Sequence, residues 1–289
     1  MFNIDQPTIL ENIPRIIIIG DVHGDITRLL NCMINANVFS KDLKWIAEPP
    51  NTVVVQMGDQ VDSLNRGISP EWEELADFEV LLLMDKLDNV AKIEGGRVLS
   101  LIGNHEIMNT LGQFNYVSPK SLSILSEQDR FLQFQPGNRF ANILAKRNII
   151  LKINSFLFCH AALMPNNLRM FDNNIHKINE ITRKILRKEP INHEEKNLYV
   201  YIALSDDSIL WSRIYTSENE NNSLLIDEVL KKTKCTNIFI GHNTVENIRG
   251  AFDNKVIFTD AALSRAYALN KIEYIDIKDN NMNIVKIDI

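Results

Sequence analysis

The chain has 289 residues with 45% hydrophobic composition, and its 31 Lys and Arg against 37 Asp and Glu give a formal net charge of -6. This length can bury one sizeable core or two small ones, and the acidic balance argues against nucleic acid as a partner, because phosphate backbones are bound by dense Lys and Arg. The start of the chain lacks the regions of a signal peptide, and no apolar run approaches the ~20 residues of a membrane span, so we expect a soluble, cytoplasmic protein with no membrane attachment.

Short apolar runs, mostly rich in β-branched residues, predict buried strands along the chain, because a strand covered on both faces needs no polar alternation. The six predicted strands are Arg15–Ile19, Thr52–Met57, Arg97–Ile102, Ile149–Ile153, Phe156–Cys159 and Asn237–Ile240.

Helical patterns fall between these runs. Ser69 and Pro70 would supply an N-cap and a first-turn proline for one helix, whose apolar face continues through Leu75, Phe78 and Leu82. The other predicted helices are Ile26–Ala36, Ile175–Leu186 and Leu224–Lys232. Polar composition makes 112–138 and 188–208 the least structured candidates and predicts a surface loop at 216–223.

The end of the chain alternates apolar and charged residues on both sides of Asp279-Asn280-Asn281, which predicts a terminal β-hairpin. No Gly/Ser-rich or Pro-rich linker divides the sequence, so we expect one α/β domain over residues 1–289 with a mixed sheet. Cys32, Cys159 and Cys235 are too few and too scattered for a disulfide framework or a thiolate zinc site. We expect them to be buried or half-buried thiols.

Five of the predicted strands end in polar residues that are unusual after an apolar run. Because the carboxyl ends of strands in open α/β sheets are where ligands bind, these residues are expected to lie together. They are Asp21 and His23 after Gly20, Asp59 after Gly58, Asn104 after Gly103, His160 after Cys159, and His242 after Gly241.

Imidazole, carboxylate and amide oxygen form a ligand set suited to Zn, Fe or Mn. Asp21 and His23 could share one metal, Asp59 could bridge two, and the remaining residues would complete a second site. Two metals about 3.5–4 Å apart form a clamp for in-line attack on phosphorus, and a water bridging them would be acidified to hydroxide. A single histidine after an apolar run is more often structural, but four of the six histidines, His23, His105, His160 and His242, follow the ends of these strands. His176 and His193 are expected at the surface.

These motifs resemble the calcineurin-like metallophosphoesterases. The motifs in question are Gly20-Asp21-Val22-His23-Gly24, Gly58-Asp59-Gln60-Val61-Asp62, Gly103-Asn104-His105-Glu106, His160-Ala161 and Gly241-His242. Asn-His-Glu in the third motif is similar to the PPP-type serine/threonine phosphatases. Leu101 to Asn109, Tyr116-Val117-Ser118, Arg139 to Arg147, Leu210-Trp211-Ser212-Arg213 and Asp260 to Arg265 resemble the bacterial-like (Shewanella-like) branch.

The resemblance implies an α/β metallophosphoesterase fold, in which two mixed β-sheets pack as a sandwich flanked by helices. It places a first metal on Asp21, His23 and Asp59, and a second on Asp59, Asn104, His160 and His242. It also implies that His105 protonates the leaving alkoxide, oriented by Asp62. Arg213 and Arg66, with Asn104, would bind the substrate phosphate, since the arginine fork matches phosphate oxygens.

The sequence departs from the family pattern in four places. Ser63-Leu64-Asn65 precede Arg66, Ala161-Ala162 follow His160, Asn243 follows His242, and Asp260-Ala261-Ala262 lacks a late glycine. None of these changes removes a metal ligand, and the insertion bears on where Arg66 points.

The leading hypothesis is therefore a phosphatase for phosphate monoesters, with phosphoserine and phosphothreonine of proteins as substrates and a metal-bridging hydroxide as nucleophile. A phosphorylated protein or a small phosphomonoester would be its partner. One alternative is a nucleotide enzyme acting on dinucleoside polyphosphates or cyclic nucleotides, which needs the same metal pair. Another is a non-catalytic metal-binding scaffold, which the four departures suggest. The sequence predicts neither the native metals nor the oligomeric state.

Overall fold

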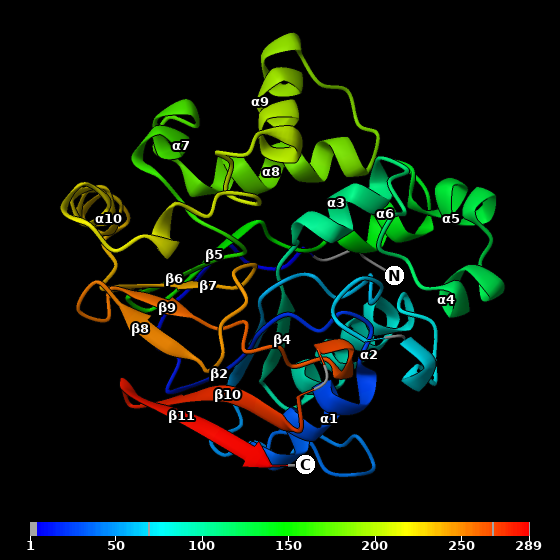
Figure 1. Cartoon of the computed structure of the whole chain (residues 1–289). Coiled ribbons are helices and arrows are strands. Elements are labelled where there is room, and N and C mark those ends of the chain that lie inside the picture. The colour runs from blue at the N-terminus through cyan, green and yellow to red at the C-terminus, as the bar shows by residue number, and fades with distance from the viewer. Residues whose placement is uncertain (1–4, 69, 268, 289) are drawn as a thin grey trace.

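The computed structural model describes residues 5–68, 70–267 and 269–288. Within them the chain forms two β-sheets with helices outside both (Figure 1). The strands are β1 (Ile9–Leu10), β2 (Arg15–Ile19), β3 (Val53–Gln56), β4 (Arg97–Ser100), β5 (Ile150–Ile153), β6 (Phe156–Cys159), β7 (Asn237–Ile240), β8 (Arg249–Ala251), β9 (Val256–Phe258), β10 (Lys271–Lys278) and β11 (Asn281–Asp288).

One sheet has the strand order β1-β5-β6-β7-β9-β8, and the other has the order β11-β10-β2-β3-β4. Both sheets are mixed. Strands β6, β7 and β9 are parallel neighbours in the first sheet, and β2, β3 and β4 are parallel neighbours in the second. The hairpin β10–β11 adds antiparallel strands to the second sheet through the pairing of β10 with β2. Each sheet thus contributes three parallel strands whose carboxyl ends lie at one edge.

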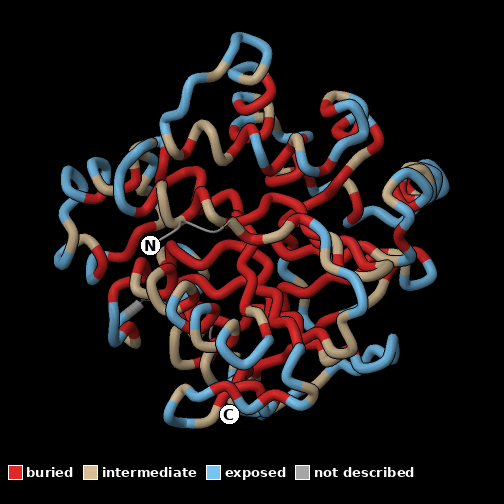
Figure 2. Tube along the Cα trace, turned by 180° about the vertical axis from the view of Figure 1, so that it is seen from behind, coloured by how far each residue is buried: buried red, intermediate tan, exposed pale blue. Residues whose placement is uncertain are grey.

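Both faces of the central strands are buried, which explains why these strands are apolar throughout. Ile16 and Ile18 of β2 pack between the sheets against residues such as Phe158 and Phe239. Ile17 and Ile19 face the other way and join the cluster beneath the helices. Figure 2 shows the same pattern along the chain, with buried residues concentrated in the central strands and exposed ones in the outer helices and loops. The predicted sandwich of two mixed sheets flanked by helices is confirmed.

Helices cover the outer face of each sheet. Helices α1 and α2 lie with β10 and β4 of the second sheet, and the remaining helices group around the first sheet and the edge between them (Figure 1). The helices are α1 (Ile26–Asn35), α2 (Glu79–Ile93), α3 (Asn104–Thr110), α4 (Pro119–Ile124), α5 (Glu127–Phe134), α6 (Arg139–Leu144), α7 (Pro165–Met170), α8 (Ile175–Leu186), α9 (His193–Leu204) and α10 (Glu220–Thr233), with short 3₁₀ turns η1 (Pro70–Trp72), η2 (Ile214–Thr216) and η3 (Arg265–Tyr267).

The prediction of one helix starting at Ser69 and Pro70 was wrong in its extent. Pro70 opens only the turn η1, and α2 begins at Glu79 with Phe78 as its N-cap, so Leu75 lies between the two elements. Ser69 itself lies outside the described residues. The predicted strands, α1, α8 and the terminal hairpin are confirmed with small shifts at their ends.

The three segments predicted to be loops contain helices. Helices α4 and α5 lie within 112–138, α9 lies within 188–208, and α10 begins at Glu220 inside 216–223. In each case a polar side chain caps the first turn: Ser118, Ser126, Asn192 and Asn219 each accept a hydrogen bond from a backbone N–H of that turn. In the described ranges, none of the helices combines the length and apolarity that crossing a membrane requires.

Candidate metal centre and active site

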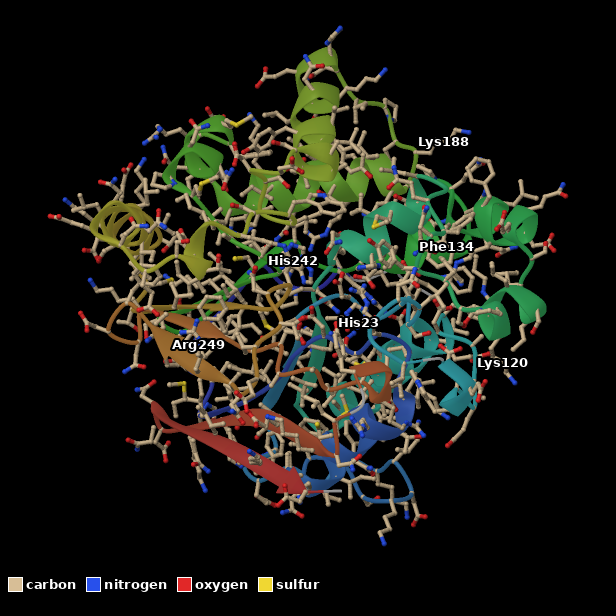
Figure 3. The ribbon with its side chains drawn as sticks, in the orientation of Figure 1. His23, Lys120, Phe134, Lys188, His242 and Arg249 are labelled. Carbon is tan, nitrogen blue, oxygen red and sulfur yellow. The ribbon has the colours of Figure 1, made fainter. Side chains whose placement is uncertain are left out.

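The polar residues predicted at strand ends gather at one edge shared by both sheets. Asp21, Asp59 and Asn104 follow β2, β3 and β4, whereas His160 and His242 follow β6 and β7. His23 and His242 lie near the middle of the molecule, between the sheet ends and the helices (Figure 3). All of these side chains except that of His160 line one cavity of about 210 Å³, and His160 is fully buried beside it.

Glycines let the backbone approach the carboxylates closely. A Cβ on Gly103 would lie 2.2 Å from Asp59 Oδ1 and 2.5 Å from the Asp59 backbone nitrogen, so any side chain at residue 103 would collide with the centre of the site. Gly58 has a φ of 97°, a conformation that other residues rarely adopt. His23, Asp59, Asp62 and His242 also have positive φ values, a local strain that concentrates at functional sites.

Three histidines are each oriented by a backbone carbonyl. Nδ1 of His160 donates to Met57 O at 2.8 Å, Nδ1 of His23 donates to Val61 O at 3.2 Å, and Nε2 of His242 donates to Trp211 O at 3.1 Å. Because a carbonyl only accepts, each of these bonds fixes the proton on that nitrogen and leaves the other ring nitrogen as a lone-pair donor. This is the orientation that metal-binding histidines need.

The remaining ring nitrogens face oxygen atoms. Oδ1 of Asn104 lies 3.0 Å from Nε2 of His160 and 3.0 Å from Nδ1 of His242. Oδ2 of Asp59 lies 3.3 Å from Nε2 of His160. Lone pairs of four side chains therefore converge on one point, and a cation there would satisfy all of them. The residues present fit a bound metal ion.

Burial and neighbouring charges shift the pKa values in the site. Burial, together with the nearby Arg66, holds the pKa of His23 well below its usual value. Burial likewise lowers the pKa of His242 to about 3. Burial acts against charge on Asp59 and His160 too, but their mutual attraction prevails, lowering the pKa of Asp59 and raising that of His160 to about 10. A metal ion would compete with that proton on His160.

Asp21 is a further buried carboxylate that lines the same cavity as Asp59. Its Oδ2 accepts a hydrogen bond from the His242 backbone N–H at 2.9 Å, while its buried Oδ1 has no hydrogen-bond partner. Burial and the neighbouring Asp260 raise the pKa of Asp21. An unsatisfied buried carboxylate oxygen is costly unless a cation or donor meets it, which also fits a metal ion.

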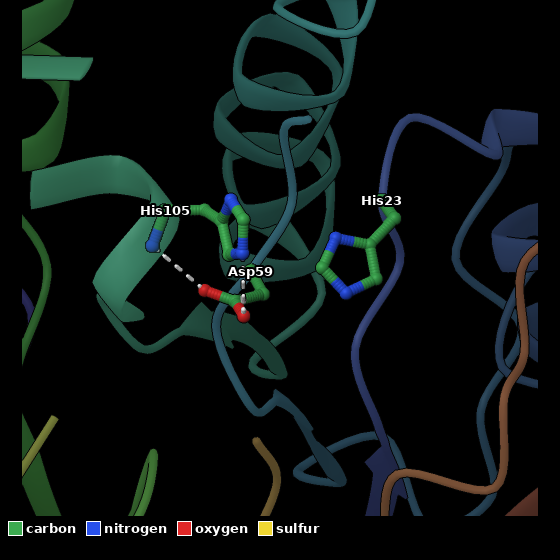
Figure 4. A group of neighbouring side chains, drawn as sticks. All are labelled: His23, Asp59 and His105. Carbon is green, nitrogen blue, oxygen red and sulfur yellow. Dashed lines mark hydrogen bonds and ion pairs between the residues drawn. The ribbon is translucent and has the colours of Figure 1, made fainter. Parts of the chain in front are cut away.

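Among the residues that the structure describes, two groups of side chains lie close enough to share an ion, and Asp59 belongs to both. Asp59, His160 and His242, three of the four residues predicted for the second metal, form one group. The other consists of His23, Asp59 and His105, drawn in Figure 4. His105 lies close to the centre, with Nε2 at 3.9 Å from Asp59 Oδ2, and it takes the place in this group that the prediction gave to Asp21, which belongs to neither group.

His105 is held from its other side by Asp62. Nδ1 of His105 lies 2.8 Å from Asp62 Oδ2, and the His105 backbone N–H donates to Asp59 Oδ1 at 3.0 Å. Asp62 also accepts from Nδ2 of Asn109. The carboxylate fixes the Nδ1–H tautomer of His105, so Nε2 remains available towards the cavity.

Both predicted arginines line the cavity. Nη1 of Arg213 donates to His242 O and to Asn243 Oδ1, each at 3.1 Å, so Asn243, one of the departures from the family pattern, helps to hold this arginine. Nη2 of Arg66 contacts Nε2 of His105. The insertion of residues 63–65 has therefore not turned Arg66 away from the site.

Glu106 is a residue whose part in the site the sequence did not indicate. Its buried carboxylate accepts from the backbone N–H groups of Gly103, Asp59 and Gln60, at 2.7, 2.9 and 2.7 Å. It thus ties the end of β4 to the loop after β3 and fixes the positions of Asp59 and Asn104. Only its place in the Asn-His-Glu motif could have drawn attention to it.

Asp260 was also missed, although the same signal was present. It follows the apolar strand β9, lines the cavity, and accepts from Thr244 Oγ1 at 2.6 Å and from the Ala262 N–H at 3.1 Å. Burial raises its pKa. Met108, Tyr116, Trp211 and Tyr267 form the apolar part of the cavity wall. His176 and His193 are exposed, and all three cysteines are buried and free, as predicted.

The family described as calcineurin-like phosphoesterase matches residues 14–258. The chain is 28% identical to Shewanella-like protein phosphatase 1 of Plasmodium berghei (strain Anka), over 94% of this chain and 74% of that protein. It is 37% identical to Shewanella-like protein phosphatase 2 of Arabidopsis thaliana over 40% of this chain and 26% of that protein. These similarities confirm the resemblance to the bacterial-like branch.

Solved structures show the same fold. The cold-active protein-tyrosine phosphatase of a psychrophile Shewanella sp. has a TM-score of 0.78 at 23% identity, over 99% of this chain and 83% of that chain. A protein serine/threonine phosphatase from Saccharomyces cerevisiae has a TM-score of 0.61 at 16% identity, over 99% and 84%. The two neighbours are named for different phosphorylated amino acids, so the fold does not distinguish between them.

Proposed function

The chain belongs to the calcineurin-like phosphoesterase family, and we propose that it is a metal-dependent phosphatase acting on phosphate monoesters, foremost the phosphoserine and phosphothreonine of proteins. One observation carries the proposal. His160 and His242 are locked by backbone carbonyls so that their free ring nitrogens both face Asn104 Oδ1 at 3.0 Å, beside the carboxylate of Asp59. Such convergence of oriented imidazole, amide and carboxylate groups is the arrangement of a metal site, in which a bound cation would take the place of the proton on His160.

Asp21, His23 and Asp59 would hold one metal ion, and Asp59, Asn104, His160 and His242 would hold a second. The nitrogen and oxygen donors suit Mn, Fe or Zn. When bound, two such ions would acidify a water molecule for attack on phosphorus and neutralise the phosphate oxygens. The ligands come from both sheets, which supports the further proposal that residues 1–289 act as one domain.

The remaining residues of the site serve the substrate. Arg213 and Arg66 lie on the cavity wall, where their guanidinium groups can bind phosphate oxygens, and the amide of Asn104 can donate to the same group. Nε2 of His105 faces the cavity and, in the imidazolium form of the ring, would deliver its proton to the departing oxygen, while Asp62 accepts from Nδ1–H and holds the ring in place. No covalent phosphoenzyme is needed in this scheme.

Hydrolysis of an aryl phosphate by the full chain with added Mn²⁺ tests the proposal directly. Asp59→Asn and His242→Ala should each abolish turnover, because both residues contribute to the convergent donor set. His176→Asn is the matched control, since His176 is exposed and remote from the cavity. If Asp59→Asn and His242→Ala both kept wild-type activity, the metal-dependent mechanism would be wrong.

A substrate panel tests the finer part of the proposal. Phosphopeptides carrying phosphoserine, phosphothreonine or phosphotyrosine in the same sequence should be compared with a dinucleoside polyphosphate and a cyclic nucleotide. We expect the two hydroxyalkyl phosphopeptides to be hydrolysed with the highest kcat/KM. A preference for phosphotyrosine or for either nucleotide would replace that assignment while leaving the metal chemistry intact.

A further inference from the structure

The segment before Arg66 folds against the segment that ends in Tyr116. The Leu64 N–H donates to Tyr116 O at 2.9 Å, and Nδ2 of Asn65 lies 3.4 Å from Asn115 O. Asn65 and Gly67 on either side of Arg66 have φ values of 61° and 139°, in a turn at 64–65 followed by bends at 66–68. These contacts bring Arg66 back to the cavity despite the three inserted residues.

The guanidinium group of Arg66 has few polar partners there. Its Nη2 contacts His105 Nε2, whereas its buried Nε has no hydrogen-bond partner. Among the described residues, no carboxylate lies within ion-pair distance of this arginine. The other group that holds it is the ring of Tyr116, whose centroid lies 5.1 Å from the guanidinium carbon.

Tyr116 touches the other side of the site as well. Its ring meets the ring of His105 edge to face, with centroids 5.0 Å apart and an angle of 79°. Tyr116 lines the cavity and is only partly exposed. One aromatic ring therefore lies under Arg66 and beside His105.

We propose that Tyr116 is a positioning residue that holds Arg66 ready for the substrate phosphate. This inference rests on the proposed function. A long arginine side chain loses conformational entropy when it binds phosphate. A ring packed against the guanidinium group already restricts the side chain before binding, so less entropy is lost when phosphate binds. The ring attracts the cation by its quadrupole, so the aromatic face carries the effect and the phenolic hydroxyl does not.

The test uses the manganese-loaded full chain and inorganic phosphate as the probe. In Tyr116→Leu we expect phosphate to bind about fivefold more weakly, and the KM values for an aryl phosphate and a phosphoserine peptide to rise by about the same factor. The kcat values should stay within about twofold of wild type. Tyr116→Phe, which keeps the ring, should match wild type, and Tyr116→Gln provides a second ringless variant.

A double-mutant cycle with Arg66→Ala gives the decisive comparison. If Tyr116 acts through Arg66, adding Tyr116→Leu to Arg66→Ala should weaken phosphate binding no further. Additive losses, an equal loss in Tyr116→Phe, or wild-type phosphate binding in Tyr116→Leu would each overturn the proposal. A fall of kcat on the phosphoserine peptide with unchanged KM would also overturn it, because Tyr116 would then act through His105.

Failure of the proposed function would look different. A wild-type protein that binds phosphate, shows the Arg66–Tyr116 coupling and yet hydrolyses no phosphomonoester would refute the function and keep the positioning role. Turnover without the coupling would refute the positioning role alone. Thermal melting and metal content of each variant confirm that the fold and the metal centre are intact in the comparison.

Discussion

Oδ2 of Asp62 lies 2.8 Å from Nδ1 of His105, and both side chains are almost fully buried. The carboxylate defines which nitrogen of the imidazole carries the proton and which nitrogen faces the cavity. Asp62 is in turn held by Nδ2 of Asn109 at 3.0 Å and by Nη2 of Arg130 at 3.5 Å. The orientation of His105 therefore depends on a buried network that extends away from the metal centre.

His105→Asn should lower kcat by about 10²- to 10⁴-fold on a phosphoserine peptide, the range expected for a lost proton donor. The loss should be much smaller on an aryl phosphate with an acidic leaving group, because that oxygen departs without a proton. Steady-state kinetics on both substrates checks this. Equal losses on the two substrates would show that His105 serves the metals and not the leaving group.

Asp59→Asn should remove more metal than any other single change, because Asp59 belongs to both groups of candidate ligands. We expect metal analysis of purified protein to show about two ions in wild type and fewer than one in Asp59→Asn. His160→Ala should lose one ion and keep the other. Exposed His193→Ala is the matched control and should keep both. Retention of two ions in Asp59→Asn would contradict the shared-ligand arrangement.

The sequence was sufficient for the six central strands, the terminal hairpin and the residues at the strand ends, because these depend on local patterns, but the short strands β1, β8 and β9 were not predicted. A short apolar run rich in β-branched residues, such as Arg15–Ile19, predicts a buried strand. The polar residue after each run then lies at the edge that the two sheets share. Capped helices such as α9 were missed because Asn192 starts the helix inside a polar segment with little apolar periodicity. The family resemblance alone pointed to Arg66, and the part of Glu106 was not predicted, since the contacts that hold these two side chains come from residues 39 and 47 positions away.

Gly103→Ala should disrupt the metal centre by a steric clash with Asp59 alone. Gly103 has a φ of -99°, which alanine adopts readily, but its Cβ would lie 2.2 Å from Asp59 Oδ1. Asp59 must therefore move, and we expect metal content to fall and the melting temperature to drop by several degrees, as for an overpacked core. Gly95→Ala is the control for metal content: its Cβ would meet no atom within 4 Å, so its φ of 89° should lower the melting temperature through local strain without removing metal. Normal metal content in Gly103→Ala would contradict this prediction, because the loop around Asp59 would then accommodate the added Cβ without disturbing the metal ligands.

The pair of Asp77 and Arg130 should govern stability in acid. Nη1 and Nη2 of Arg130 each donate to the carboxylate of Asp77 at 2.8 Å, and both side chains have no exposed surface. Burial alone would raise the pKa of Asp77, but Arg130 and the surrounding hydrogen bonds hold it below the usual 3.8. The folded state therefore binds this proton less readily than the unfolded chain does. The resulting stabilisation is complete above pH 3.8 and is lost as the pH falls through the lower folded pKa.

Asp77→Asn removes the closer carboxylate from the buried Arg130, leaving only Asp62 at 3.5 Å, and should cost about 3–5 kcal/mol of unfolding free energy at pH 7. The difference from wild type should shrink as the pH falls below 3.8, because wild type then loses the same charge. Denaturant unfolding between pH 7 and pH 3, with a chelator present so that metal release does not contribute, measures both curves. Asp172→Asn, which removes an exposed partner of Lys177, is the control and should change stability little at any pH. A constant difference between Asp77→Asn and wild type across this range would mean that the ion pair does not carry the acid sensitivity of the fold.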